Sequence, residues 1–207
     1  MSNILNLFAE TIYINKLDVE LNSLLKYLAK INFVKSGNKN LRNTKEKSLA
    51  SINKDIFNYN RIFKKLKKEV INEFNHFKND HLKYHNVNFG ITTSWLTVAR
   101  TNEYSDLHCH KNCFYSGIFY LKTSENCGNL VLENLEKKGS YLFTPTEYNA
   151  LNSNTSEVKP VDNLIIFFPS YLYHRIDVNN SPEDRISLAF NIIPVGKYGT
   201  KGDSAIL

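Results

Sequence analysis

Hydrophobic and polar positions in the N-terminal part of the chain follow the period of one strand and then of two helices. Residues 7–16 alternate as a strand does, and 18–33 carry an apolar stripe at helical spacing with Asp18 as the expected N-cap. A polar stretch over 35–50 predicts a loop. Apolar residues then recur every three or four positions over 55–82, which predicts an amphipathic helix with one face on a core.

From about residue 90 the pattern changes to short apolar runs that are rich in Ile, Val, Phe and Tyr and separated by turn residues. The expected strands are 91–100, 114–122, 129–134, 141–144, 163–168, 171–177 and 185–194. Seven short strands after two helices predict an antiparallel sandwich or barrel with helices packed against it. Because no Pro- or Gly-rich linker divides the chain, we expect one domain over 1–207. Its parts are a mainly helical 1–88, a β core at 89–196 and a tail at 197–207.

Composition narrows the class of protein. The chain has 207 residues, 42% hydrophobic and 22% charged, which excludes a disordered, collagenous or coiled-coil protein. No apolar run approaches the length of a membrane-spanning helix, and the N-terminus lacks the features of a signal peptide. Because the number of cysteines, three, is odd and no signal peptide is expected, we predict reduced thiols and a cytoplasmic protein.

The formal net charge is +6, which solvated lysines explain and which also suits an anionic substrate or partner. Nucleic-acid binding is disfavoured, because the aromatic residues fall mostly at core-like positions rather than beside a basic stripe. The sequence does not indicate the oligomeric state.

Three histidines form the clearest candidate site. His108 and His110 are two residues apart on an extended segment, so both imidazoles can reach one point. His174 follows a strand that Pro169 ends. Two ligands at this step with a distant third are typical of a metal at the mouth of a β-barrel, and three protein ligands leave positions open for catalysis.

A candidate anion site follows on the last expected strand. Arg185 and Ser187 are two residues apart and share one face of it. An arginine beside a hydroxyl inside a barrel can bind a carboxylate, and a buried arginine without an anionic partner is costly.

The cysteines offer an alternative, a structural zinc site formed with the histidines by Cys109, Cys113 and Cys127. However, Cys109 alternates with the histidines and should face the other way, and no paired CxxC steps occur.

Several sequence blocks together resemble a known family. The blocks are Trp95, His108-x-His110, Ser116-Gly117-Ile118-Phe119-Tyr120-Leu121, Phe168-Pro169-Ser170 with His174, and Arg185-Ile186-Ser187 with Phe190-Asn191. They resemble iron(II)/2-oxoglutarate-dependent oxygenases of marine bacteria and their phages, relatives of the prolyl-hydroxylase-like oxygenases. The resemblance implies an α+β fold: a double-stranded β-helix (jelly-roll) core with N-terminal helices packed against it. It also implies Fe(II) at the three histidines and a 2-oxoglutarate carboxylate on Arg185.

One position departs from the wider superfamily, where the second metal ligand is Asp or Glu. This chain has His110 there, so either the site is a three-histidine variant, which we favour, or Asp106 or Glu133 supplies a carboxylate. Tyr120 and Ser187 are further candidates for binding 2-oxoglutarate.

Three less direct expectations complete the site. Trp95 can wall the substrate pocket or lie in the core. Asn191 can orient a ligand or pair with backbone. Ser116 and Gly117 fit a close approach of strands near the site.

The expected function is hydroxylation by a non-haem iron(II) and 2-oxoglutarate-dependent dioxygenase. The three histidines would be catalytic, O₂ the second cosubstrate, and succinate and CO₂ the co-products. The substrate would be a small molecule or a peptide, with an amino-acid side chain or a metabolite as the hydroxylated group. Two alternatives stay open: a cupin-like three-histidine enzyme that uses no 2-oxoglutarate, and a zinc-stabilised β-sandwich that is not an enzyme.

Overall fold

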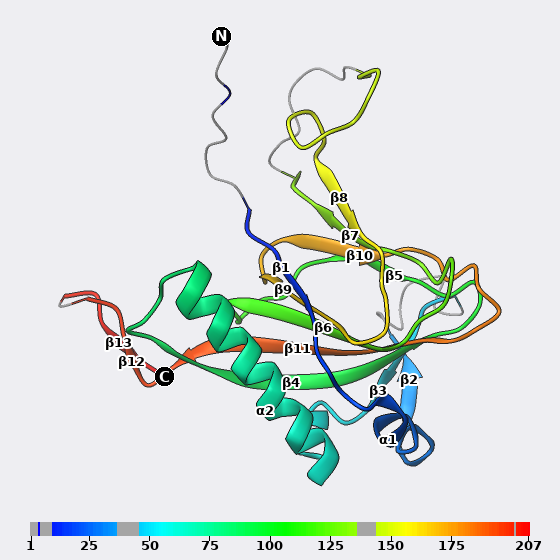
Figure 1. The fold of residues 1–207 in the computed structure, drawn as a ribbon, viewed down its shortest axis with the longest axis horizontal. Helices are drawn as coiled ribbons and strands as arrows, with labels where there is room; N and C mark the ends of the chain where they lie inside the picture. The colour runs from blue at the N-terminus through cyan, green and yellow to red at the C-terminus, as the bar shows by residue number, and fades with distance from the viewer. Residues whose placement is uncertain (1–3, 5–9, 37–45, 136–143, 201) are drawn as a thin grey trace.

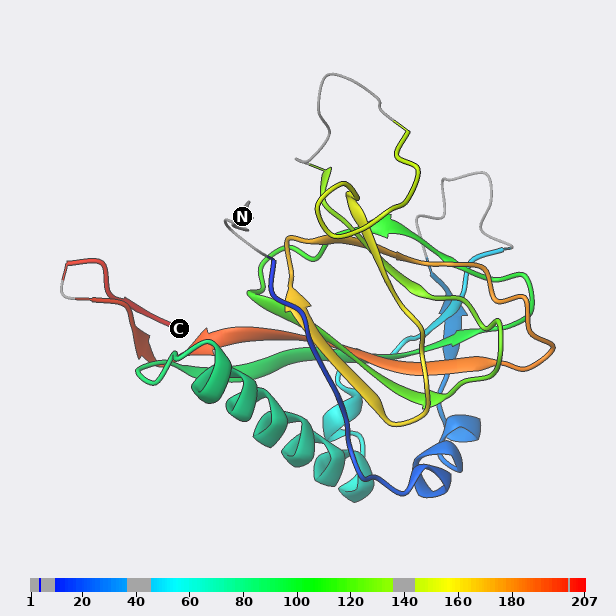
Figure 2. The ribbon, with the colours of Figure 1, turned by 45° about the horizontal axis from the view of Figure 1, so that its top comes forward.

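Two antiparallel sheets face each other, and helices cover the outer side of the larger one (Figures 1 and 2). The computed structural model describes residues 4, 10–36, 46–135, 144–200 and 202–207. The start of the strand expected at 7–16 and most of the one expected at 141–144 lie outside these residues. This arrangement confirms the predicted α+β jelly roll with helices against it.

The larger sheet has seven strands and the smaller has four. In spatial order the larger sheet is β1 (Tyr13–Lys16), β9 (Leu164–Pro169), β6 (Tyr115–Lys122), β11 (Arg185–Val195), β4 (Asn88–Ala99), β3 (Leu49–Ser51) and β2 (Phe33–Lys35). The smaller sheet is β5 (Ser105–His108), β10 (Tyr173–Ile176), β7 (Leu130–Glu133) and β8 (Thr155–Val158). A separate hairpin of β12 (Lys197–Tyr198) and β13 (Ala205–Ile206) occupies the expected tail.

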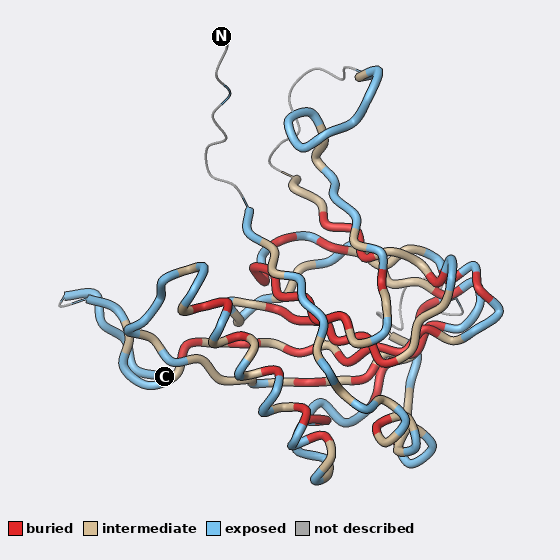
Figure 3. The backbone as a smooth tube through the Cα atoms, in the orientation of Figure 1, coloured by how far each residue is buried: buried red, intermediate tan, exposed pale blue. Residues whose placement is uncertain are grey.

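Helix α2 (Arg61–His76) is the main cover of the larger sheet, and it confirms the second predicted helix. It follows the 3₁₀ turn η2 (Ile56–Asn58) and continues into the π-helical turn η3 (Phe77–His81). Asn60 caps it by accepting hydrogen bonds from two backbone N–H groups of the first turn. Buried residues recur along the helix at spacings of three and four (Figure 3), and they belong to one core with the outer face of the sheet. These helix residues are Phe63, Leu66, Val70 and Phe74.

The helix expected over 18–33 is much shorter than predicted. Only α1 (Leu21–Leu25) and the 3₁₀ turn η1 (Leu28–Lys30) form, and Glu20 rather than Asp18 is the N-cap. The chain then enters β2, which begins at the end of the predicted helix and pairs with β3, which begins at the end of the stretch predicted as a loop. Pairing with a neighbouring strand outweighs local helix preference here.

Two strands of the larger sheet, β9 and β11, differ in their hydrophobic pattern because their surroundings differ. Every residue of β9 is buried, because one face packs on the helix layer and the other on the space between the sheets. In β11 the apolar residues from Ile186 to Ile192 face the helices. The alternate positions, Arg185, Ser187, Ala189 and Asn191, therefore face the interior of the jelly roll.

The sequence analysis missed β5 and β8 as well as β2 and β3. Neither β5 nor β8 has an apolar run, and most of their residues are exposed. They form by pairing at the two edges of the smaller sheet, which no local pattern shows. Among the described residues, no helix is long and apolar enough to cross a membrane.

Candidate metal centre

The three predicted histidines meet at one end of the jelly roll. His108 ends β5 and His174 lies on β10, and the two residues are paired across these strands. Their ring centroids are 4.3 Å apart, and the His110 centroid lies 5.2 Å from His108 and 5.0 Å from His174. One nitrogen from each ring lies within 4.8 Å of the other two. Three imidazoles this close can share a metal ion.

Hydrogen bonds at Nδ1 orient all three rings. His108 Nδ1 lies 2.7 Å from the carbonyl oxygen of Asp106, and His174 Nδ1 lies 3.0 Å from that of Leu172. Because a carbonyl oxygen only accepts, these two Nδ1 atoms carry the proton and their Nε2 lone pairs are free. His110 Nδ1 has side-chain partners instead, 2.7 Å from Asn191 Oδ1 and 2.7 Å from Ser116 Oγ.

Burial keeps two of the rings uncharged. Burial and the neighbouring His108 together lower the pKa of His174 to about 3 and that of His110 to about 4. Both imidazoles are therefore neutral at pH 7, which is the form that binds metals.

The two alternative carboxylates lie elsewhere. The Asp106 carboxylate pairs with the ammonium group of Lys47. Glu133 pairs across the strands with Tyr173, so it lies on the opposite face of the sheet from His174. It forms an ion pair of 3.7 Å with Arg175. In the described part of the chain the cluster therefore holds three histidines without a carboxylate.

The cysteines do not join the cluster. Cys109, Cys113 and Cys127 are free thiols, and no group of potential metal ligands that includes them is found among the described residues. The mixed Cys/His zinc site considered from the sequence is therefore not assembled there.

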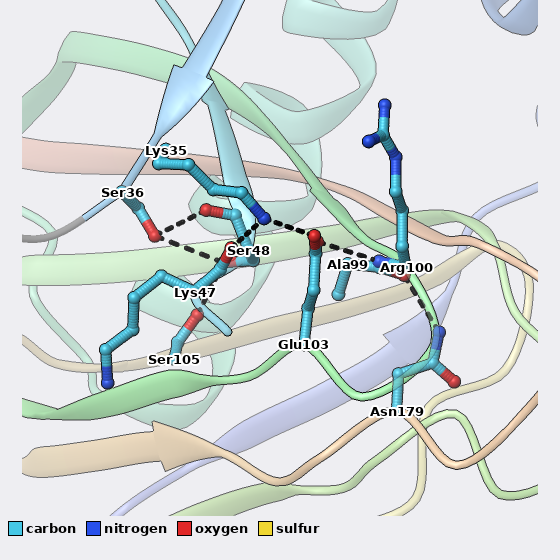
Figure 4. A network of polar contacts seen from close by, with 9 residues as sticks. All are labelled: Lys35, Ser36, Lys47, Ser48, Ala99, Arg100, Glu103, Ser105 and Asn179. Atoms are coloured by element: carbon cyan, nitrogen blue, oxygen red, sulfur yellow. Dashed lines mark hydrogen bonds and ion pairs between the residues drawn. The ribbon is translucent and has the colours of Figure 1, made fainter. Parts of the chain in front are cut away.

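Polar contacts from neighbouring strands hold β5, the strand that ends at His108, in place (Figure 4). The Lys35 ammonium group pairs with Glu103, just before β5. Ser48 Oγ, beside β3, lies 3.0 Å from Ser105 Oγ on β5. Because β5 has few apolar side chains to bury, these contacts from the β2–β3 hairpin hold it in place.

Arg185 is a buried cation within the jelly roll. It is only 2% exposed, and its Nη1 donates to the carbonyl oxygens of Cys127, Gly128 and Asp177. No carboxylate among the described residues forms an ion pair with it. Gly128 has a φ of +89°, and a Cβ atom there would lie 2.7 Å from Nη1 and 2.2 Å from the carbonyl oxygen of Asp177. Glycine thus lets this turn wrap closely around the guanidinium group.

Tyr120 supplies a hydroxyl to the same interior. Its Oη is buried and has no hydrogen-bond partner within the described part of the chain. Burial raises the pKa of Tyr120 to about 12, and the positive charge of Arg185 opposes this rise. Ser187 pairs with Tyr120 across β11 and β6 and shares the inner face with Arg185. Among the described residues Arg185 has no ion-pair partner and the Tyr120 hydroxyl has no hydrogen-bond partner, an arrangement that fits a bound carboxylate.

Trp95 lies beside the metal cluster. It is half-buried on β4, with its ring centroid 5.5 Å from that of His110. The ammonium group of Lys54 lies 5.8 Å from the indole centroid. Trp95 therefore lies beside the histidine cluster.

The buried serines near His110 were not predicted to have this role. Ser116 Oγ contacts His110 Nδ1 and lies 2.9 Å from Ser170 Oγ. Asn191 was expected to orient a ligand or pair with backbone, and its side chain in fact contacts His110. Its inward position could have been inferred from the alternation that Arg185 and Ser187 begin.

Comparison with known proteins shows which class this chain resembles. Residues 93–191 match a family described as "Putative 2OG-Fe(II) oxygenase". The match runs from β4 to β11 and includes all three histidines and Arg185. This part of the jelly roll is therefore similar to the 2OG-Fe(II) oxygenases, enzymes that use iron(II) and 2-oxoglutarate. No curated protein matches the chain in sequence.

Solved structures of such enzymes share the fold. HygX from Streptomyces hygroscopicus, with nickel, 2-oxoglutarate and hygromycin B bound, is 12% identical with a TM-score of 0.62, covering 89% of this chain and 83% of HygX. A prolyl-4-hydroxylase from Pseudomonas putida is 12% identical with a TM-score of 0.60, covering 88% and 92%. A prolyl hydroxylase from Trichoplax adhaerens, in complex with a hypoxia inducible factor peptide fragment, is 13% identical with a TM-score of 0.59, covering 88% and 83%. At these identities the likeness is one of fold.

Proposed function

We propose that this protein is an iron(II) and 2-oxoglutarate-dependent dioxygenase that hydroxylates a small molecule or a peptide. His108, His110 and His174 would hold the iron. Arg185, Tyr120 and Ser187 would hold the far carboxylate of 2-oxoglutarate. The observation that carries the proposal is the presence, in one jelly roll, of a three-histidine cluster and a buried arginine that has no ion-pair partner among the described residues.

The donor set fits iron(II). Imidazole nitrogen is a common ligand of iron, and three protein ligands leave room for a chelating cosubstrate and O₂. When bound, the iron supplies the oxidative decarboxylation of 2-oxoglutarate by O₂, with succinate, CO₂ and the hydroxylated substrate as products. One oxygen atom enters succinate and the other enters the substrate, so no external reductant is needed.

The side chains of the protein supply binding and orientation. The Arg185 guanidinium would neutralise the far carboxylate, and the Tyr120 hydroxyl would donate a hydrogen bond to it. The apolar interior between the sheets would exclude water from this carboxylate and so strengthen both contacts. Trp95 would limit the space beside the metal and so orient the substrate.

Arg185 and Tyr120 also distinguish this proposal from the cupin-like alternative. A three-histidine enzyme without a cosubstrate has no use for a buried cation and an unpartnered hydroxyl. HygX is solved with hygromycin B bound and the Trichoplax adhaerens enzyme with a peptide fragment, which supports both a small molecule and a peptide as candidate substrates.

Anaerobic calorimetry tests the proposal. Metal-free protein is titrated with Fe(II) and then with 2-oxoglutarate, and the same series is run on His174→Ala and on His85→Ala, a matched exposed histidine outside the cluster. We expect 2-oxoglutarate to bind tightly only after iron, His174→Ala to bind neither, and His85→Ala to match the wild type. Iron binding that survives His174→Ala would contradict the proposed centre.

Hydroxylation itself is tested with ¹⁸O₂ once a substrate is in hand. One labelled atom in succinate and one in the product would support it. A product without label would contradict it.

A further inference from the structure

Four side chains from different parts of the jelly roll converge behind His110. Asn191 Oδ1 and Ser116 Oγ each lie 2.7 Å from His110 Nδ1, and they lie 3.2 Å from each other. Ser170 Oγ lies 2.9 Å from Ser116 Oγ, and Asn191 Nδ2 donates to Thr93 Oγ1 at 3.0 Å. Ser116 and Ser170 are buried, so these polar atoms depend on one another for hydrogen bonds.

The orientation of the Asn191 amide, with Oδ1 toward His110 and Nδ2 toward Thr93, fixes the placement of protons. His110 Nδ1–H donates to Asn191 Oδ1 and Ser116 Oγ, the Ser116 hydroxyl donates to Asn191 Oδ1, and the amide nitrogen of Asn191 donates to Thr93. The Nε2 lone pair of His110 is then free, as it is at His108 and His174. The opposite amide orientation would place the proton on Nε2 and leave no lone pair toward the other two rings.

His110 differs from its two partners in how it is held. His108 and His174 are fixed by backbone carbonyls within two residues along the chain. His110 instead depends on side chains, and Asn191 is separated from it by 81 positions. The ring that occupies the usual carboxylate position therefore has its own dedicated support, built on β4, β6 and β11.

We infer that Asn191 is a positioning residue that holds His110 as the Nδ1–H tautomer and so makes a histidine usable as a metal ligand at this position. Thr93 holds the Asn191 amide in the required orientation, and Ser116 provides the second acceptor. The inference rests on the proposed function, because it takes His110 to be a ligand. Partners of this kind behind a metal-bound histidine typically change metal affinity by about 10–100-fold.

The tautomer is measured first, by long-range ¹⁵N–¹H NMR on the metal-free protein, with His110→Gln used to assign the signals. We expect His110 to carry its proton on Nδ1 in the wild type and to lose this preference in Asn191→Ala. A proton on Nε2 in the wild type would overturn the inference, and this result does not depend on any metal.

Co(II) affinity and the ligand-field spectrum give the second readout. Asn191→Ala should weaken Co(II) binding by about 10–100-fold, and Thr93→Val should weaken it less. Asn191→Asp keeps an acceptor facing His110 and should restore the wild-type affinity and spectrum. An effect of Asn191→Asp as large as that of Asn191→Ala would overturn the inference.

Asn179→Ala is the matched control. Asn179 is a fully buried asparagine, whereas Asn191 is partly buried, and Asn179 donates to the carbonyl oxygens of Ala99 and Glu183. We expect it to lower the melting temperature without changing Co(II) affinity. An equal loss of affinity in this variant would show that the effect of Asn191→Ala is one of general stability.

Two outcomes separate the inference from the proposed function. If the wild-type protein and His110→Ala bind Co(II) equally well, the proposed metal centre is wrong. If the wild-type protein binds Co(II) through His110 and Asn191→Ala binds it equally well, only the role of Asn191 is contradicted.

Discussion

Replacing Tyr120 with phenylalanine should have opposite effects on stability and on cosubstrate affinity. The Tyr120 hydroxyl is buried and has no hydrogen-bond partner in the described part of the chain, so its removal breaks no contact there. A buried polar group without a partner costs about 1–3 kcal/mol. With the low end of that range, Tyr120→Phe should raise the free energy of unfolding of the metal-free protein by about 1 kcal/mol. For a chain of this length the melting temperature would rise by about 2–4 °C.

The same change should weaken 2-oxoglutarate binding. A hydrogen bond to a charged group contributes about 1.5–3 kcal/mol, so losing the phenol should raise the Kd about 10–100-fold. Scanning calorimetry of the metal-free protein and an anaerobic titration of the iron form measure the two effects. A lower melting temperature would show that the hydroxyl has a partner within the protein. An unchanged Kd would show that it does not face the cosubstrate, and the reasoning would be refuted.

Three other substitutions test separate parts of the account. Arg185→Lys keeps the charge but loses the planar fork, and it should raise the Kd for 2-oxoglutarate by about 100-fold in an anaerobic titration while iron affinity stays within about 3-fold. Asp106→Asn should leave iron affinity unchanged in a metal titration, because this carboxylate pairs with Lys47; a loss of about tenfold or more would return Asp106 to the site. In Gly117→Ala the new Cβ would lie 2.2 Å from the Phe190 ring. Chemical denaturation should therefore show that the free energy of unfolding falls by about 1–3 kcal/mol. An unchanged free energy of unfolding would contradict the close approach of β6 and β11.

The hydrophobic periodicity of the sequence predicted the helix and the strands that have one regularly buried face. Helix α2 and the strands β4, β6, β7, β9, β10 and β11 all lie at or near the predicted positions. The short edge strands were missed because partners distant in sequence form them. The helix predicted over 18–33 was wrong for the same reason, since Phe33 pairs with Ser51 rather than continuing a helical turn.

The sequence predicted those parts of the candidate site in which two residues lie two positions apart on one strand and therefore share a face. The step between His108 and His110, and the step between Arg185 and Ser187, follow from strand alternation. The sequence could not choose between His110 and Asp106, because the choice depends on Lys47, which is 59 positions from Asp106. The support of His110 by Asn191 and Ser116 depends equally on contacts between distant strands.

The optical spectrum of the anaerobic protein tests the central claim most directly. Iron(II) chelated by 2-oxoglutarate gives a weak metal-to-ligand charge-transfer band. We predict that the band appears only when both Fe(II) and 2-oxoglutarate are present and is absent in His174→Ala. Protein that retains tightly bound zinc and shows no band, or that binds iron without responding to 2-oxoglutarate, would contradict the account.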